Sequence, residues 1–159
     1  MSRKGFTLLE LIIVVAIIGL LAAATFVAVN PAKRQGNAQN ATRWTDITAI
    51  ADAWSAYLGD HNSELPTSSV PCLTGNTTCM IANYGGTDTD YACTASTTNN
   101  IIWLDPLVNE GYIGKIPNDP KSASAITTST GYYFAYDSVG KLTVGACDSY
   151  NSQAIKVVR

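Results

Sequence analysis

The chain has 159 residues and a formal net charge of −2, and 14% of its residues are charged, below the roughly 25% usual in soluble globular domains. This length accommodates one domain plus an anchor. The weakly negative, scattered charge gives no clear nucleic-acid site, and the sequence has no internal repeat or low-complexity tract.

The first predicted element is an apolar helix near the N-terminus. Residues Leu11–Val29 carry no charge, and a bilayer core of about 30 Å needs about 20 helical residues. A plain transmembrane anchor is one interpretation. A secretory signal peptide is another, with Arg3 and Lys4 before the apolar core and a cut near Ala22-Ala23-Ala24. Glu10, which interrupts that core, and the apolar residues beyond the cut count against a signal peptide.

A second, amphipathic helix is predicted after Pro31, a residue that removes a backbone donor and can kink or restart a helix. Apolar residues then recur at three- and four-residue steps, which marks one face of a helix: Ala41, Trp44, Ile47, Ala51, Trp54 and Leu58. Trp44 and Trp54 are therefore expected in the core of a globular domain. Together the two patterns predict one long helix from Phe6 to about Leu58.

The remaining sequence predicts a small α+β domain. Residues 67–100 are rich in Thr, Ser, Asn and Gly without a clear period, which indicates loops with at most short strands. Asp105–Gly111 has the proline and glycine placement of a short helix. Two alternating segments flank Ser138–Gly140, and residues 153–158 offer a third strand. An antiparallel sheet follows, with one face on the amphipathic helix. The alternating residues are Tyr132, Phe134, Tyr136, Leu142, Val144 and Ala146.

All four cysteines lie outside the apolar run: Cys72, Cys79, Cys93 and Cys147. Four cysteines allow three pairings, and in an exported domain two disulfides are the default expectation. The short spacing between Cys72 and Cys79 suits a small closed loop, which would leave Cys93 to pair with Cys147. The other two pairings remain open at this point.

No catalytic or metal-binding motif emerges, and no cofactor is expected. A cysteine-ligated zinc is disfavoured because there is no C-x-x-C pair and His61 is the only histidine. Asp88 and Asp90, in a glycine-containing loop, are weak calcium candidates, although the twelve-residue calcium-loop pattern is missing. No nucleophile–histidine arrangement, G-x-S-x-G motif or phosphate-binding loop is present.

The stretch "GFTLLELIIVVAIIGLLAAA" closely resembles the leader junction of type IV pilins and type II secretion pseudopilins. A short basic leader ends at Gly5, Phe6 follows, and Glu10 is the fifth residue after the junction. The segments "DITAIADAWSAYLGDHNSELPT" and "GYIGKIPNDP" also resemble parts of these proteins. The resemblance is strong over residues 3–66 and fair over residues 104–120.

The resemblance implies a leader (1–5), a transmembrane and assembly helix (6–30), and a pilin-like globular domain (31–159) that includes the second half of the long helix. It implies cleavage between Gly5 and Phe6 by a prepilin peptidase and methylation of the new Phe6 amine. Glu10 would contact the N-terminus of a neighbouring subunit. The partners would be further copies in a filament, other pilins, the peptidase and N-methyltransferase, and a pilus or secretion assembly machinery in the membrane.

The implied protein is a non-enzymatic, single-pass inner-membrane protein that becomes a surface, extracellular or periplasmic filament. Two departures bear on its type. The helix proline frequent in the family would fall near Val27, whereas here Pro31 lies four residues later. The calcium-binding C-terminal pattern of major secretion pseudopilins is missing, and Lys121 follows Pro120. The shifted proline bears on where the helix would be locally unwound. The missing calcium pattern favours a pilin or a generic pilin-like subunit over a major secretion pseudopilin, and the competing class is a membrane-anchored binding or enzymatic domain.

Overall fold

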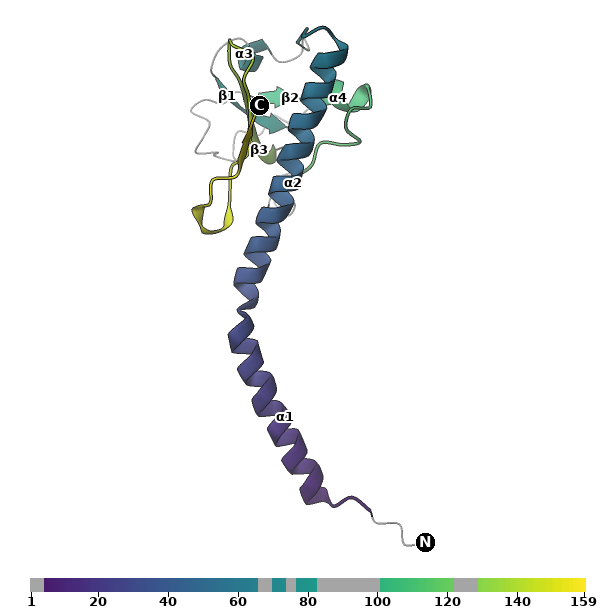
Figure 1. The fold of residues 1–159 in the computed structure, drawn as a ribbon, viewed down its shortest axis with the longest axis vertical. Coiled ribbons are helices and arrows are strands. Elements are labelled where there is room, and N and C mark those ends of the chain that lie inside the picture. Colours follow the sequence, from purple (N-terminus) through teal and green to yellow (C-terminus); the bar gives the residue numbers. More distant parts are fainter. Residues whose placement is uncertain (1–4, 66–69, 74–76, 83–100, 122–128) are drawn as a thin grey trace. The chain divides into compact units, whose positions relative to one another are not determined.

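The computed structural model describes residues 5–65, 70–73, 77–82, 101–121 and 129–159 (Figure 1). The chain divides into two compact units, Met1–Asn37 and Ala38–Arg159. Two helices come first, α1 (Leu8–Val29) and α2 (Pro31–Asp60), and the α+β class expected from the sequence is confirmed. The other elements are α3 (Val70–Leu73), β1 (Thr78–Ala82), β2 (Ile101–Trp103), α4 (Asp105–Asn109), β3 (Ser129–Tyr136), β4 (Leu142–Ala146), the 3-10 turn η3 (Tyr150–Ser152) and β5 (Lys156–Val158).

The helix breaks at Asn30, so the prediction of one continuous helix to Leu58 is wrong. Asn30 has φ 42° and ψ 78°, a left-handed conformation. The following Pro31 disfavours the helical region for the residue before it, and asparagine tolerates the left-handed region better than most residues. The Asn30 side-chain oxygen also accepts a hydrogen bond from the backbone N–H of Lys33 at 3.2 Å. Asn30 therefore ends α1 and caps α2.

The buried face of α2 is rotated from the predicted one. Ile47 and Trp54 are buried as expected, but Ala41 is exposed and Trp44 keeps 38% of its surface exposed, so the core placement of Trp44 is wrong. The three- and four-residue spacing predicted the wrong face of α2 because it is based on apolar side chains only. Two polar residues, Asn40 and Arg43, also face the core. The residues of α2 buried in the domain are Asn40, Arg43, Ile47, Ile50, Ala51, Ala53, Trp54 and Tyr57.

The sheet has five strands in the order β2-β1-β3-β4-β5. The antiparallel meander β3-β4-β5 is the one predicted from the alternating segments. β1 also pairs antiparallel with β3, but β1 and β2 run parallel, with Met80 opposite Ile101. The sheet is therefore mixed, and not antiparallel throughout.

The core lies between α2 and the sheet, which are side by side in Figure 1. The Trp54 ring meets the Phe134 ring edge-on, with centroids 4.7 Å apart. This geometry is favourable for aromatic pairs. Tyr132 and Phe134 are fully buried, as the alternation in β3 predicts. Gly145 lies opposite Tyr133, and a Cβ at Gly145 would come within 2.3 Å of the Tyr133 ring, so the close approach of these strands requires glycine.

Candidate functional site

The start of α1 is held by a reciprocal capping box between Thr7 and Glu10. The backbone N–H of Glu10 donates to the Thr7 hydroxyl at 3.3 Å. In return, the Glu10 carboxylate accepts from the Thr7 backbone N–H at 3.0 Å and from its hydroxyl at 2.8 Å. Both bonds to the carboxylate are made to Oε2, and among the described residues no donor is bonded to Oε1. Glu10 therefore presents a negative charge, with one oxygen available, at the N-terminal end of its own helix.

The sequence contained a signal for this arrangement that the resemblance alone does not use. Thr7-Leu8-Leu9-Glu10 is a Thr-x-x-Glu capping-box pattern, which marks helix starts. Glu10 thus has a local role in the helix besides the role in assembly that the resemblance implies. Gly5 and Phe6 directly precede the cap, and Phe6 is 82% exposed. The structure therefore brings the expected cleavage junction and Glu10 into one short segment.

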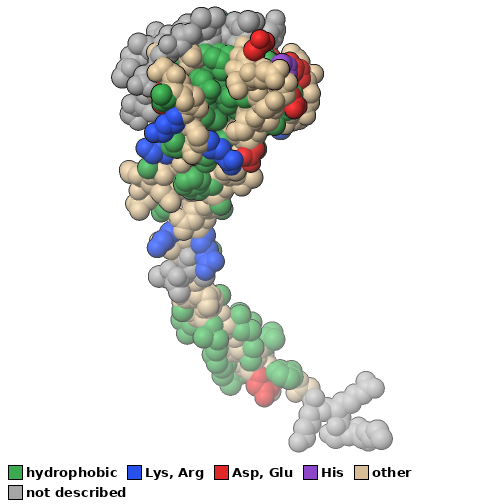
Figure 2. Space-filling view, turned by 45° about the horizontal axis from the view of Figure 1, so that its top comes forward, with side chains coloured by type: hydrophobic (Ala, Val, Ile, Leu, Met, Phe, Trp, Pro, Cys, Tyr) green, Lys and Arg blue, Asp and Glu red, His purple; other side chains and the backbone are tan. Residues whose placement is uncertain are grey.

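Behind this segment, α1 presents an apolar surface on all sides. The stretch Leu8–Phe26 is long and apolar enough to cross a membrane, and none of it is buried within the chain. The exposure of its large side chains runs from 47% at Val14 to 75% at Leu8. Figure 2 shows α1 covered by hydrophobic side chains, with one acidic group near its N-terminal end; Glu10 is the acidic residue of its first turn. Such a helix requires lipid or protein around it.

Within the domain, a buried ion pair fixes the start of the packed part of α2. The Arg43 guanidinium donates from Nε to Asp119 Oδ2 at 2.5 Å and from Nη2 to Oδ1 at 2.9 Å. The two side chains are only 1% and 0% exposed. These bonds raise the pKa of Arg43 above its ordinary value. Sequence reasoning missed this pair because neither residue belongs to a motif.

Asn40, one turn before Arg43, extends the network to the C-terminal segment. Its side-chain oxygen accepts from Arg43 Nη1 at 2.8 Å and from the backbone N–H of Tyr150 at 2.9 Å. Its amide nitrogen donates to the Tyr150 carbonyl and to the Gln153 side chain, both at 3.1 Å. Asp119 in turn accepts from the backbone N–H of Lys121 at 2.8 Å. One cluster thus ties α2 to the segment that holds Asp119 and to the C-terminal segment around Tyr150.

A second polar contact joins α2 to the central strand. The Tyr132 hydroxyl, on β3, donates to Asp46 Oδ2 at 2.6 Å. Burial and this hydrogen bond both raise the pKa of Tyr132 above its ordinary value. Burial raises the pKa of Asp46 as well, and the bond from Tyr132 partly offsets that increase. The contact joins α2 to the central strand of the sheet.

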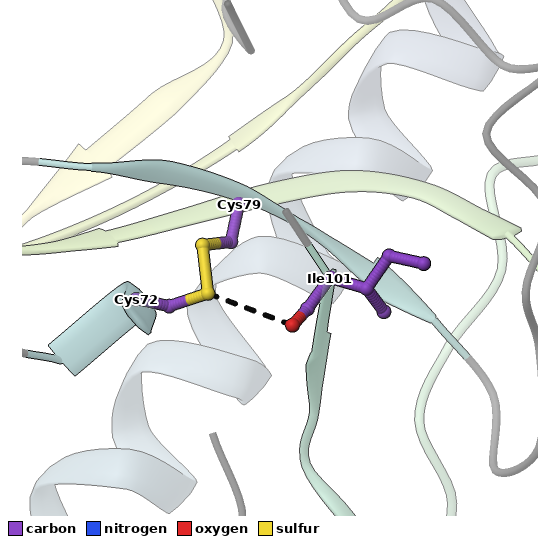
Figure 3. The surroundings of a disulfide bond; sticks show 3 residues. All are labelled: Cys72, Cys79 and Ile101. Carbon is purple, nitrogen blue, oxygen red and sulfur yellow. Dashed lines mark hydrogen bonds between the residues drawn. A yellow bond between two sulfur atoms is a disulfide. The ribbon is translucent and has the colours of Figure 1, made fainter. Parts of the chain in front are cut away.

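The structure contains the Cys72–Cys79 disulfide, which joins α3 to β1 (Figure 3). Both cysteines are fully buried. The sulfur of Cys72 lies 3.5 Å from the carbonyl oxygen of Ile101, at the start of β2; because a disulfide sulfur carries no proton, this is a packing contact. Cys147 is disulfide-bonded too. Cys93, its expected partner, lies outside the described residues, so that pairing stays a prediction.

Replacing Cys72 and Cys79 by alanine together should lower the free energy of unfolding by about 2–3 kcal/mol, because a short closed loop no longer restricts the unfolded chain. Denaturant unfolding of the detergent-solubilised full chain measures the loss. Peptide mapping should show that Cys147 remains oxidised in the variant. An unchanged stability, or free thiols at Cys72 and Cys79 in native protein, would contradict the assignment.

The weak calcium candidates Asp88 and Asp90 also lie outside the described residues. Within the described ranges, no three His, Cys, Asp or Glu side chains cluster in a way that could hold a metal ion. The described part of the chain thus offers one segment with a clear functional signature, the capped and exposed start of α1.

An exposed apolar helix with a capped carboxylate at its start, followed by a helix packed on a small sheet, defines a pilin-like α+β protein. The family model for the prokaryotic N-terminal methylation motif matches residues 1–26. The type II secretion system core protein G of Escherichia coli (strain K12) is 28% identical over 139 residues, which are 86% of this chain and 79% of that protein. No solved structure matches the chain significantly. The motif and this relative support the type IV pilin and pseudopilin family, as the sequence resemblance predicted.

Proposed function

We propose that this chain is a structural subunit of a type IV pilus or related pilin-like filament, and that it has no enzymatic activity. The observation that carries the proposal is the segment from Gly5 to Phe26: a methylation-motif junction, a carboxylate at a capped helix start, and an apolar helix without cover in the chain. In this proposal residues 1–5 are a leader, residues 6–30 anchor and assemble the subunit, and residues 31–159 form the outward-facing domain.

The carboxylate and the processed N-terminus form a complementary pair. Cleavage between Gly5 and Phe6 creates an α-amine with an ordinary pKa near 8, so this amine is mostly protonated at neutral pH, and methylation keeps its charge. Two opposite charges about 4 Å apart attract by about 4 kcal/mol at an effective dielectric of about 20. A charge at the centre of a membrane helix costs about 2.5–3.5 kcal/mol. A paired Glu10 is therefore tolerated in an apolar filament core, whereas an unpaired Glu10 is penalised.

The capping box defines how Glu10 would act between subunits. Oε2 is engaged with Thr7 of its own chain, while none of the described residues donates to Oε1. An incoming ammonium group from a neighbouring Phe6 would donate to Oε1 without breaking the cap. The pairing would favour subunits in register, because an ammonium group out of register leaves both charges buried without partners.

Processing gives the direct test of this proposal. The intact mass of membrane-extracted protein should show loss of Met1–Gly5 and gain of one methyl group on Phe6. The same protein should be recovered from the membrane, because cleavage leaves the apolar helix intact. A chain beginning at Thr25 would instead identify an ordinary signal peptide, and an unprocessed chain beginning at Met1 would support a simple membrane anchor.

A secretion pseudopilin is the second candidate, and the similarity to the Escherichia coli core protein G favours it. The two candidates share processing and assembly and differ in what the filament serves. Deleting the gene should abolish surface pili if the chain is a pilin. It should block export of folded proteins, with surface pili unchanged, if the chain is a pseudopilin.

A further inference from the structure

β5 forms one edge of the five-stranded sheet, and one side of its backbone is bonded to β4. The N–H of Leu142 donates to the carbonyl oxygen of Arg159 at 2.8 Å, and the N–H of Arg159 donates back to Leu142 at 2.9 Å. Successive residues of an antiparallel strand direct these groups to opposite sides. The N–H and C=O groups of Val158 and, two residues earlier, of Lys156 therefore point away from β4, and no described residue forms a hydrogen bond with them.

The side chains of this edge alternate between the core and the solvent. Ile155 is buried and Val157 packs against the core cluster between α2 and the sheet. Lys156 is exposed, and Val158 keeps 46% of its surface exposed. Because side chains two residues apart share a face of a strand, Lys156 and Val158 both lie on the face of the sheet away from α2. A strand added to β5 would therefore place one side chain beside Lys156 and another, two residues along, beside Val158.

The positive charge of this edge is concentrated at Lys156. The guanidinium of Arg159 pairs with Asp52 of α2 at 2.6 Å. Lys141, just before β4, has a carboxylate close to it, because its backbone N–H donates to Asp137 at 2.8 Å. Lys156 forms no salt bridge within the described part of the chain. The unbonded backbone edge of β5 thus carries a cation that no described residue neutralises.

This charge decides which kind of strand can pair with β5. A second copy of β5 would bring two Lys156 side chains onto one short ladder, directly opposite or diagonal to each other, and a lysine on an edge strand opposes such self-pairing. An extended segment with an acidic residue beside Lys156 turns this repulsion into attraction. A β-branched apolar residue two positions away would cover Val158. In strand addition the backbone hydrogen bonds supply affinity, and alternate side chains such as these supply specificity.

We propose that the free edge of β5 accepts an extended segment of a different protein by strand addition, and that this segment carries an acidic residue beside Lys156 and an apolar residue two positions away beside Val158. The inference goes beyond the proposed function and does not require a filament, because the edge belongs to the compact unit Ala38–Arg159. It assigns to β5 a role in binding a partner that is separate from the charge pairing of Glu10.

Two synthetic peptides test the proposal on the full chain in an uncharged detergent. The peptide STETVTS has a glutamate and a valine two positions apart, and STKTVTS replaces the glutamate by lysine. Fluorescence anisotropy should show that STETVTS binds about tenfold or more tightly than STKTVTS, because a like-charge pair replaces an opposite-charge pair. Bound STETVTS should slow hydrogen exchange at the amides of Lys156 and Val158 but not at Val157, which faces β4. No binding of either peptide at millimolar concentration, or equal affinities, would overturn the proposal.

Three variants separate strand addition from simple charge attraction. Val158→Pro removes an outward N–H, at a position where an edge strand tolerates proline, and should weaken STETVTS binding about fivefold or more. Lys156→Glu should reverse the preference, so that STKTVTS binds more tightly. Lys115→Glu makes the same change of charge at an exposed site outside the sheet and should leave both affinities within about twofold.

Thermal unfolding of these variants in detergent should match that of wild type, since all three side chains are exposed. If Val158→Pro lowers stability, the Lys156→Glu variant decides alone. Unchanged peptide binding by a stable Val158→Pro variant would overturn the proposal, and so would an unchanged preference in Lys156→Glu.

Discussion

Replacing Arg43 by methionine should lower the free energy of unfolding by about 3–5 kcal/mol, the usual cost of breaking a buried ion pair from one side. The variant leaves the Asp119 carboxylate in the core, where it is 0% exposed, without the guanidinium that donates to both of its oxygens. Asn40 also loses a donor to its side-chain oxygen. Denaturant unfolding of the detergent-solubilised full chain, followed by near-ultraviolet circular dichroism, measures the change.

The chain offers two controls for this experiment. Arg159 and Asp52 form the same kind of pair at the surface, with side chains 46% and 55% exposed, so Arg159→Met should cost at most about 1 kcal/mol. The double variant Arg43→Met with Asp119→Leu removes both buried charges and should be more stable than Arg43→Met alone. Equal stability losses for Arg43→Met and Arg159→Met would show that the buried pair has no special part in holding α2 to the domain.

Glu10→Leu should leave the domain folded and abolish most filament assembly. In the membrane, the variant helix should insert at least as well as wild type, because the charge penalty is gone. In the filament, the Phe6 ammonium would be buried without its partner, at a cost of about 3–5 kcal/mol, or hundreds-fold or more in subunit association. The measurement compares membrane and sheared-filament fractions, and cleaved variant protein should accumulate in the membrane.

The capping box requires a control of its own, because Glu10→Leu also removes the cap of α1, worth about 0.5–2 kcal/mol. Thr7→Val removes the hydroxyl of the cap and keeps the carboxylate, so it should retain most of the filament yield. Equal losses for Thr7→Val and Glu10→Leu would assign the effect to helix capping. Full yield from Glu10→Leu would show that the carboxylate has no part in assembly.

Local patterns predicted those parts of the fold that depend on local chemistry. The alternation of Tyr132 and Phe134 predicted β3, and the apolar run predicted α1. In both, the spacing of apolar residues follows directly from the surface that the element turns toward apolar surroundings. Sequence reasoning did less well where tertiary contacts decide. It placed Trp44 in the core because no local signal shows that Asp119, far along the chain, draws Arg43 inward. It also extended one helix through Asn30, where the constraint from the following proline is stronger than the helical period.

The residues of the candidate site were easier to predict from the sequence than the tertiary contacts of α2. The junction at Gly5 and Phe6 and the carboxylate of Glu10 stand in one short stretch, so residue spacing was enough to name them. The bond from Thr7 to Glu10 also had a sequence pattern, but only the coordinates show that Thr7 donates to Oε2 alone of the two carboxylate oxygens.

The most direct test of the central claim, that α1 is an assembly helix and not only an anchor, is the intact mass and location of the chain in wild-type cells. Filaments sheared from the cells, or from cells overexpressing the chain, should contain this protein beginning at a methylated Phe6, with all four cysteines oxidised. Wild-type protein found only in the membrane fraction, as single chains with Met1 still in place, would contradict the account.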